Sequence, residues 1–181
     1  INMKVLVTGP EGLLGSNVVR ELLAQNYEVL VMSEDGKDSP TIDDLPIQKI
    51  AGNLLKPTEI DQAINGATYV IHCAASTKMF PPKSELVNKI NIDGTQAIID
   101  ACLKHNVKRL VYIGTANSFE SGTKEAPGDE LHGYMGAKYG VDYMDSKYKA
   151  QCLIQRACKE DGLNAVVINP TYMIGPYDST S

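Results

Sequence analysis

The chain has 181 residues, of which 43% are hydrophobic and 22% are charged, a composition typical of a globular protein with one core. Its net charge of −5 argues against a surface that neutralises nucleic-acid phosphates. No apolar run approaches the roughly 18 residues that cross a bilayer. We therefore expect a single domain over residues 1–181, with no nucleic-acid or membrane partner.

Short β-type runs alternate with helical patterns along the chain. We predict strands at 4–8, 28–32, 47–51, 68–73, 109–113 and 164–168. We predict helices at 12–25, 57–64, 84–105 and 143–161. This alternation predicts an α/β fold with a Rossmann-like, doubly wound parallel sheet of strand order 3-2-1-4-5-6. The sequence stops soon after the sixth strand, so we expect a minimal or C-terminally truncated domain without a substrate lobe.

Three glycines open the first predicted helix, directly after the apolar strand at 4–8. They are Gly9, Gly12 and Gly15. Glycine lacks a Cβ atom, so the backbone can turn tightly and approach a diphosphate, and the helix can pack close to the strand. The start of the helix also offers free N–H groups to an anion. Glycine serves ordinary turns as well, but its position between a strand and an amphipathic helix predicts a dinucleotide site.

The cysteines and histidines show no spacing typical of a metal site or a redox pair. They are Cys73, Cys102, Cys152, Cys158, His72, His105 and His132. We expect reduced thiols, no metal and a cytoplasmic location. No secretion signal opens the chain, and we interpret Ile1 and Asn2 as an expression remnant before Met3.

A tyrosine and a lysine stand four residues apart at the start of the last predicted helix. Tyr143 and Lys147 would share one helix face, where the ammonium group favours the phenolate and lowers the pKa of the phenol. The pair is thus a candidate general acid/base, or else an ordinary surface contact. A second pair, Tyr134 and Lys138, is surrounded by glycines and is expected to lie in a loop. Thr115, just past the fifth strand, would bind a substrate oxygen or only its own loop backbone.

Together these motifs resemble the extended short-chain dehydrogenase/reductase family, also described as the NAD-dependent epimerase/dehydratase family. The resemblance covers almost the whole chain. The matching motifs lie in order at 8–15, 53–54, 72–75, 91–95, 143–147 and 170–176. The chain looks most similar to the dihydroflavonol-reductase-like members, from its long helix after Ser84, its loop with Glu130 and its Asn-Pro-Thr run at 169–171.

The resemblance implies a set of site residues. Tyr143 would be the catalytic acid/base, Lys147 would bind the nicotinamide ribose and lower the pKa of Tyr143, and Thr115 would replace the usual serine. The implied cofactor-binding residues are Gly9, Gly12, Leu13, Leu14, Gly15, Ser33, Glu34, Asn53, Leu54, Cys73, Ala74, Ala75, Asn91, Lys147, Pro170 and Met173. Asn53 departs from the family's aspartate, and Gln151 replaces a glutamate often found four residues after the lysine.

Charge at the end of the second strand bears on the choice of cofactor. Family members that prefer NAD usually place an acidic residue there on the ribose 2′-OH, whereas those that prefer NADP place an arginine nearby. Glu34 and Asp35 would repel a 2′-phosphate, so we favour NAD over NADP. Ser33 would accept either form, and Lys37 leaves NADP open.

Three functions remain open from the sequence. The first is hydride transfer between nicotinamide and a carbonyl or secondary alcohol, the second an internal redox cycle on a nucleotide-sugar, and the third dinucleotide sensing without turnover. The third class would be marked by loss of the tyrosine or the lysine, and both are present. Helices 84–105 and 143–161 resemble the pair through which family members often dimerise. We expect a homodimer acting on a small molecule, unless the apolar faces of these helices are fully buried against the sheet.

Overall fold

The computed structural model describes residues 3–34 and 39–178. The strands are β1 (Lys4–Thr8), β2 (Glu28–Ser33), β3 (Gln48–Ala51), β4 (Tyr69–His72), β5 (Arg109–Ile113) and β6 (Ala165–Ile168). The α-helices are α1 (Leu13–Ala24), α2 (Pro57–Ile64), α3 (Glu85–Asn88), α4 (Gly94–Lys104) and α5 (Asp142–Glu160). Each predicted element is confirmed, with ends that differ by one residue at most. Ile1, Asn2, Asp35 and Lys37 lie outside the described residues.

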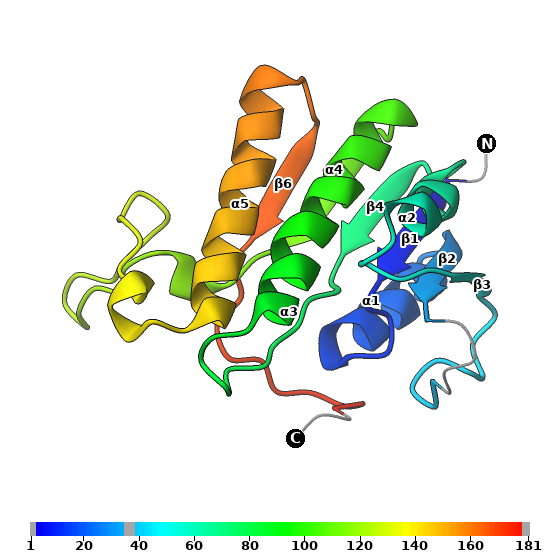
Figure 1. The fold of residues 1–181 in the computed structure, drawn as a ribbon. Helices are drawn as coiled ribbons and strands as arrows, with labels where there is room; N and C mark the ends of the chain where they lie inside the picture. Colours follow the sequence, from blue (N-terminus) through cyan, green and yellow to red (C-terminus); the bar gives the residue numbers. More distant parts are fainter. Residues whose placement is uncertain (1–2, 35–38, 179–181) are drawn as a thin grey trace.

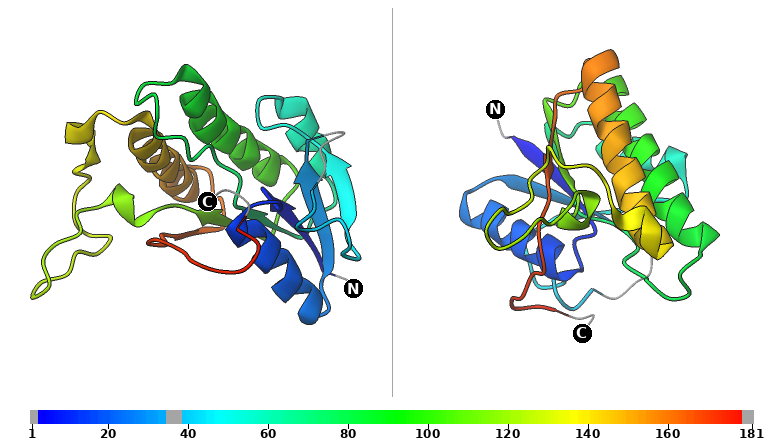
Figure 2. Two further views of the ribbon diagram at one scale, coloured as in Figure 1. Left: turned by 90° about the horizontal axis from the view of Figure 1, so that it is seen from below. Right: turned by 90° about the vertical axis from the view of Figure 1, so that its left-hand side faces the viewer.

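The six strands form one parallel sheet in the order β3-β2-β1-β4-β5-β6, as predicted. Helices α2, α4 and α5 cover one face of the sheet, and α1 covers the opposite face (Figures 1 and 2). Leu6 in β1 is paired in register with Leu30 in β2 and Val70 in β4. All three side chains are buried in the larger core cluster, which they share with α2, α4 and α5. The sheet's central strands are therefore apolar because both of their faces are covered.

The face covered by α1 is only partly filled. Val7 and Val31 pack with α1 and with Ile42 of the loop before β3. At the other end of this face, Val166 and Ile168 of β6 are 41% and 50% exposed. No helix within 3–34 and 39–178 lies over them (Figure 2).

The helix predicted at 84–105 contains an internal irregularity. Between α3 and α4 the chain forms one π-helical turn, η1 (Lys89–Asp93). Asn91, at its centre, is buried and makes hydrogen bonds to neighbouring segments instead of facing solvent. Hydrophobic periodicity located the ends of this helix correctly, but one wider turn leaves no clear mark in that periodicity. Among the described helices, none combines the length and the apolar character needed to span a membrane.

The contact between β1 and α1 yields a stability test. A Cβ atom on Gly15 would overlap the carbonyl oxygen of Gly9, whereas one on Gly12 would meet that oxygen only at 3.8 Å. We expect Gly15→Ala to lower the free energy of unfolding by roughly 1–3 kcal/mol through overpacking. Gly12→Ala, the matched control at the helix N-cap, should change it by less than about 1 kcal/mol. Urea unfolding of both variants would measure this, and equal losses would contradict the close contact.

Candidate functional site

Three stretches of backbone meet at the C-terminal end of β1. Gly9 has a positive φ of 66°, and a Cβ there would stand 2.7 Å from the backbone of Ala74, just after β4. A Cβ on Gly15, in α1, would overlap the carbonyl oxygen of Gly9. The N-cap of α1, Gly12, contributes no side-chain hydrogen bond to the first turn. The N–H groups at this helix start therefore have no side-chain cap and can serve as donors to an anion.

A buried chain of hydroxyl and imidazole groups runs beneath this turn. The Thr8 hydroxyl is 2.7 Å from Nδ1 of His72 and accepts a 3.2 Å hydrogen bond from the amide of Ala74. The other ring nitrogen, Nε2 of His72, is 3.3 Å from the hydroxyl of Thr95 on α4. Burial lowers the pKa of His72 to about 3, so the ring is neutral. His72 thus ties β1, β4 and α4 together, a role that the motif containing it did not reveal.

Asn91 links the segment after β4 to α5. Its amide nitrogen donates to the carbonyl of Ser76 at 3.0 Å and to the hydroxyl of Ser146 at 2.9 Å. Its amide oxygen accepts from the Ser76 N–H at 2.7 Å. These hydrogen bonds anchor Ser76, which directly follows Cys73, Ala74 and Ala75, and cofactor binding by Asn91 stays a prediction. No motif in the sequence pointed to Ser76 or Ser146.

Lys147 is the most deeply buried cationic group of the site. Its side chain donates a 2.6 Å hydrogen bond to the carbonyl of Ile113, and Nζ is 4.6 Å from the centre of the Tyr112 ring. The residue is only 4% exposed. Burial lowers its pKa to about 8, an effect partly opposed by the nearby thiol of Cys73. Burial also raises the pKa of Cys73 to about 12, so this cysteine is a neutral thiol beside the amine.

Tyr143 lies one turn before Lys147 on α5, as predicted, but the effect on its pKa is the opposite of the one expected. Burial raises the pKa of the phenol, and a hydrogen bond with Thr115 acts in the other direction. The expected lowering by Lys147 was wrong for this structure, in which burial of the phenol is the dominant cause of the shift. Thr115 is buried, and its amide donates to the side chain of Asn169 at 3.0 Å.

The remaining predicted residues follow the ends of other strands on the same edge. Ser33 ends β2, and the side chain of Asn53 donates to Glu34 at 3.4 Å. Leu54 packs against Gly94. A Cβ atom added to Gly94 would stand 3.2 Å from the Cβ of Leu54.

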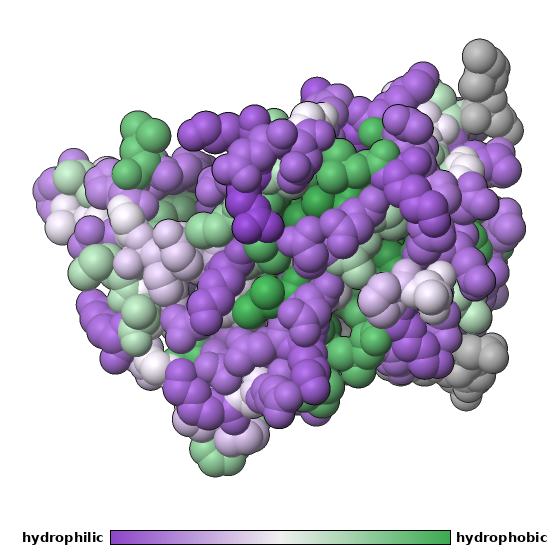
Figure 3. Space-filling view, turned by 45° about the horizontal axis from the view of Figure 1, so that its top comes forward, coloured by the Kyte–Doolittle hydropathy of each residue, from purple (hydrophilic) through white to green (hydrophobic). Residues whose placement is uncertain are grey.

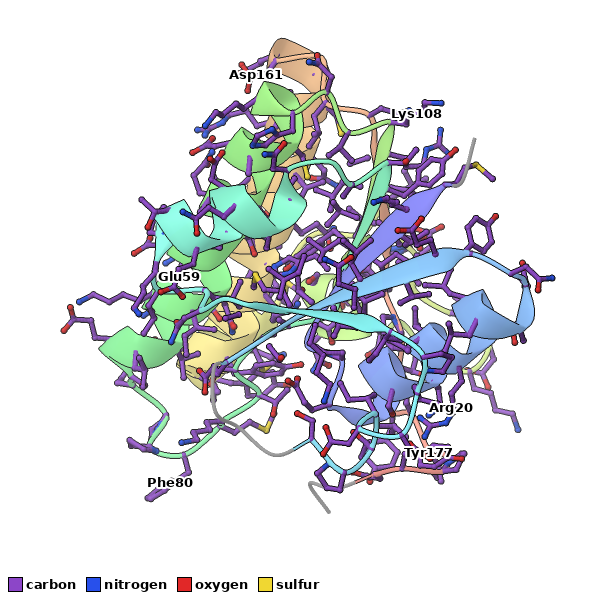
Figure 4. All side chains as sticks on the ribbon, turned by 90° about the vertical axis from the view of Figure 1, so that its right-hand side faces the viewer. Arg20, Glu59, Phe80, Lys108, Asp161 and Tyr177 are labelled. Atoms are coloured by element: carbon purple, nitrogen blue, oxygen red, sulfur yellow. The ribbon has the colours of Figure 1, made fainter. Side chains whose placement is uncertain are left out.

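The loop after β6 borders the opposite end of this edge. Pro170 accepts a 3.0 Å hydrogen bond from the amide of Ala116, and Met173 is 39% exposed. Gly175 lies against Leu13, which opens α1 together with Leu14. Figure 4 shows Tyr177 stacked beside Arg20 at the end of the molecule opposite Lys108 and Asp161. The predicted site residues therefore gather along one edge of the sheet, around α1 and the start of α5.

The second tyrosine–lysine pair, the metal-binding residue types and the cysteines complete the predicted features. Tyr134 lies in a loop, as expected, and Lys138 falls in a short 3₁₀ turn, η3 (Gly136–Tyr139). No group of three or more His, Cys, Asp or Glu residues suited to a metal ion occurs within the described part of the chain. The four cysteines are free thiols.

The buried amine of Lys147 predicts a pH-dependent contribution to stability. Folding lowers its pKa from 10.5 to about 8, so between these values the unfolded chain binds more protons than the folded one. The contribution of Lys147 to the free energy of unfolding should therefore rise with pH across this window, by up to about 3 kcal/mol, while the buried thiols of Cys73 and Cys102 contribute in the opposite direction above about pH 9. Urea titrations should show this rise to be absent in Lys147→Met and kept in a control, Lys138→Met. Parallel curves for all three proteins would contradict it.

Comparisons with known proteins agree with this geometry. The family model described as "NAD dependent epimerase/dehydratase family" matches residues 5–181. A putative dihydroflavonol 4-reductase of Synechocystis is 28% identical over 95% of this chain and 50% of its own length. A 2-alkyl-3-oxoalkanoate reductase of Stenotrophomonas maltophilia is 27% identical over 97% of this chain and 52% of its own. The chain therefore spans about half the length of these relatives.

The fold is also found in solved structures. A UDP-glucose 4-epimerase of Thermus thermophilus, solved with NAD, superimposes with a TM-score of 0.79 over 92% of this chain and 54% of its own, at 23% identity. The resemblance drawn from the motifs, including the likeness to dihydroflavonol reductases, is confirmed. This chain belongs to the NAD-dependent epimerase/dehydratase family.

Proposed function

We propose that the chain carries the cofactor-binding and acid/base half of an NAD(P)-dependent oxidoreductase acting on a carbonyl or a secondary alcohol. One observation carries this proposal. The segment after β4 has the glycine turn on one side, where Gly9 approaches Ala74, and the buried amine of Lys147 beside Cys73. A dinucleotide lying along this segment would extend from the start of α1 to the start of α5.

The residues present fit a nicotinamide dinucleotide. Side chains at Gly9 and Gly15 would collide with the backbone of Ala74 and of Gly9, so their absence allows the tight turn that would bring the start of α1 close to a diphosphate. The first-turn amides of α1 would hold the diphosphate, Glu34 the adenosine ribose, and Lys147 the nicotinamide ribose. When bound, the cofactor would supply or accept the hydride.

The chain's own residues would handle the proton. The phenol of Tyr143, whose pKa burial raises, is protonated at neutral pH and would be the proton donor to a carbonyl oxygen. Thr115, which shares a hydrogen bond with this phenol, would orient the same oxygen. In the oxidation direction, the phenol of Tyr143 would have to give up its proton first, a step that its burial opposes.

A second function shares these residues. The likeness to a UDP-glucose 4-epimerase favours an internal redox cycle, in which the nicotinamide returns to its starting state within each turnover. NAD retained through purification, and turnover only of a nucleotide-sugar, would support this alternative. Release of the cofactor and net consumption of NADH would support the oxidoreductase.

Two further expectations concern the protein as a whole. The free thiols, of which Cys73 and Cys102 have a pKa raised to about 12 by burial, are consistent with a cytoplasmic location.

In Figure 3 hydrophilic side chains cover most of one side of the molecule, with hydrophobic ones in a central band. The homodimer through α4 and α5 stays a prediction, which light scattering would contradict by finding a monomer at high concentration.

The position of Glu34 predicts a preference for NADH over NADPH. A carboxylate at the end of β2 repels the 2′-phosphate, so NADH should bind about tenfold more tightly. Glu34→Gln should narrow this ratio by improving NADPH binding, while Glu21→Gln, a surface control on α1, should leave it unchanged. Fluorescence titration of both cofactors measures the ratio. A ratio insensitive to Glu34→Gln would remove this residue from the ribose site.

Tyr143 gives the direct test of the proposed chemistry. Tyr143→Phe removes the hydroxyl and should reduce the rate of NADH-dependent reduction by about 10²–10⁴-fold, with NADH affinity little changed. A panel of a dihydroflavonol and 2-alkyl-3-oxoalkanoates would be assayed through nicotinamide absorbance. Tyr139→Phe, at a tyrosine that is 63% exposed, is the matched control. Full activity in Tyr143→Phe would overturn the assigned role.

A further inference from the structure

The first turn of α5 contains a carboxylate that binds an entire loop. Oδ1 of Asp142 forms a 3.0 Å ion pair with Lys83, and its Oδ2 accepts from the Ser84 amide at 2.7 Å and from the Asn88 side chain at 3.1 Å. The amide of Asp142 in turn donates to the carbonyl of Pro82 at 2.7 Å. Asp142 is 9% exposed, and these contacts hold its pKa below the ordinary value. The carboxylate is thus ionised and its contacts all come from one segment, 82–88.

Asp142 belongs to a row of α5 residues that all contact the same neighbour. Ser146, one turn further, shares a hydrogen bond with Asn91 of η1, which follows α3 directly. Both members of the row therefore bind the segment made of α3 and η1. Tyr143 and Lys147 follow them in sequence and lie about 100° further round the helix. Because both pairs lie on one helix, any rotation of α5 about its axis moves Asp142 and Ser146 together with Tyr143 and Lys147.

The loop before α3 depends on this carboxylate, because its own side chains pack little. Met79 and Phe80 are 52% and 85% exposed, and Phe80 projects from the loop in Figure 4. Without the carboxylate, the Ser84 amide and the Asn88 amide group would lose an acceptor. The start of α5 would then keep only one of these two links to the segment of α3 and η1, the hydrogen bond between Ser146 and Asn91.

We propose that Asp142 is a positioning residue that fixes the rotation of α5 about its axis and so holds Tyr143 beside Thr115 and Lys147 beside the Ile113 carbonyl. The fixation follows from the contacts above. What Tyr143 and Lys147 do in these positions rests on the proposed function. An asparagine at 142 keeps one oxygen as a hydrogen-bond acceptor but replaces the other with an NH₂ group. This NH₂ group would face the donor of Lys83 or of Asn88, so some of the Asp142 contacts are lost without a change in side-chain volume.

The test compares Asp142→Asn with Asp145→Asn. Asp145 lies in the same helical turn and carries the same charge. It accepts from the Tyr134 hydroxyl at 2.6 Å and forms a longer, 3.9 Å ion pair with Lys83, whereas the hydrogen bonds from Ser84 and Asn88 go to Asp142. Two signals are followed in the folded protein: the NMR titration of the Lys147 side chain without cofactor, and NADH affinity by fluorescence. Asp142→Asn should move the Lys147 midpoint up toward that of an exposed lysine and weaken NADH binding about fivefold. Asp145→Asn should leave the midpoint in place and change affinity by less than about twofold.

A third variant shows whether the effect runs through Lys147. Asp142→Asn combined with Lys147→Ala should bind NADH no more weakly than Lys147→Ala alone. A further loss in the double variant, or identical behaviour of the 142 and 145 variants, would overturn the proposal. If Asp142→Asn does not fold, Asn88→Ala replaces it, and an unmoved Lys147 midpoint in that variant would equally overturn it. A wild-type chain that binds no NADH would refute the proposed function, while the titration would still decide the role of Asp142.

Discussion

The absence of two Cβ atoms is the constraint on which this structure depends. Gly9 and Gly15 let β1, α1 and the segment after β4 approach within van der Waals contact, and any larger residue would drive them apart. The buried hydrogen bond between Thr8 and His72 forms across this same junction. Separating the strands here would leave polar groups buried without partners. Close backbone packing therefore creates the accessible helix start and also makes the polar chain beneath it possible.

The second constraint is the burial of Lys147. An amine taken out of water is destabilised in its charged form, and here the carbonyl of Ile113 and the face of the Tyr112 ring offset part of that cost. Both partners belong to β5, so the position of the amine is set by how α5 packs on the sheet. The same packing buries Tyr143 and raises its pKa. The electrostatics of the pair thus follow from the placement of one helix.

Hydrophobic periodicity and glycine placement were enough to predict the fold, because each element depends on residues adjacent in the sequence. The strand order followed from the right-handed crossovers between consecutive strands. The direction of the Tyr143 pKa shift could not be predicted, since spacing shows that Lys147 is near but not how deeply the phenol is buried. Asp142 was missed because an acidic residue at a helix start is common, and its partners at 83–88 lie more than fifty residues earlier.

The two sides of the candidate site differ in how firmly the scaffold holds them. On the cofactor side, Asn91 and Lys147 are buried and bonded to backbone carbonyls. On the side beyond Thr115, the loops after β5 and β6 expose large apolar residues, with Leu131 93% and Tyr172 89% exposed. Loops with little packing tolerate substitution far better than a buried junction does. Under the proposed function, such a division would let one cofactor and one acid/base pair serve different substrates, because contacts to the substrate could change while the glycine turn and the orientation of α5 stay fixed.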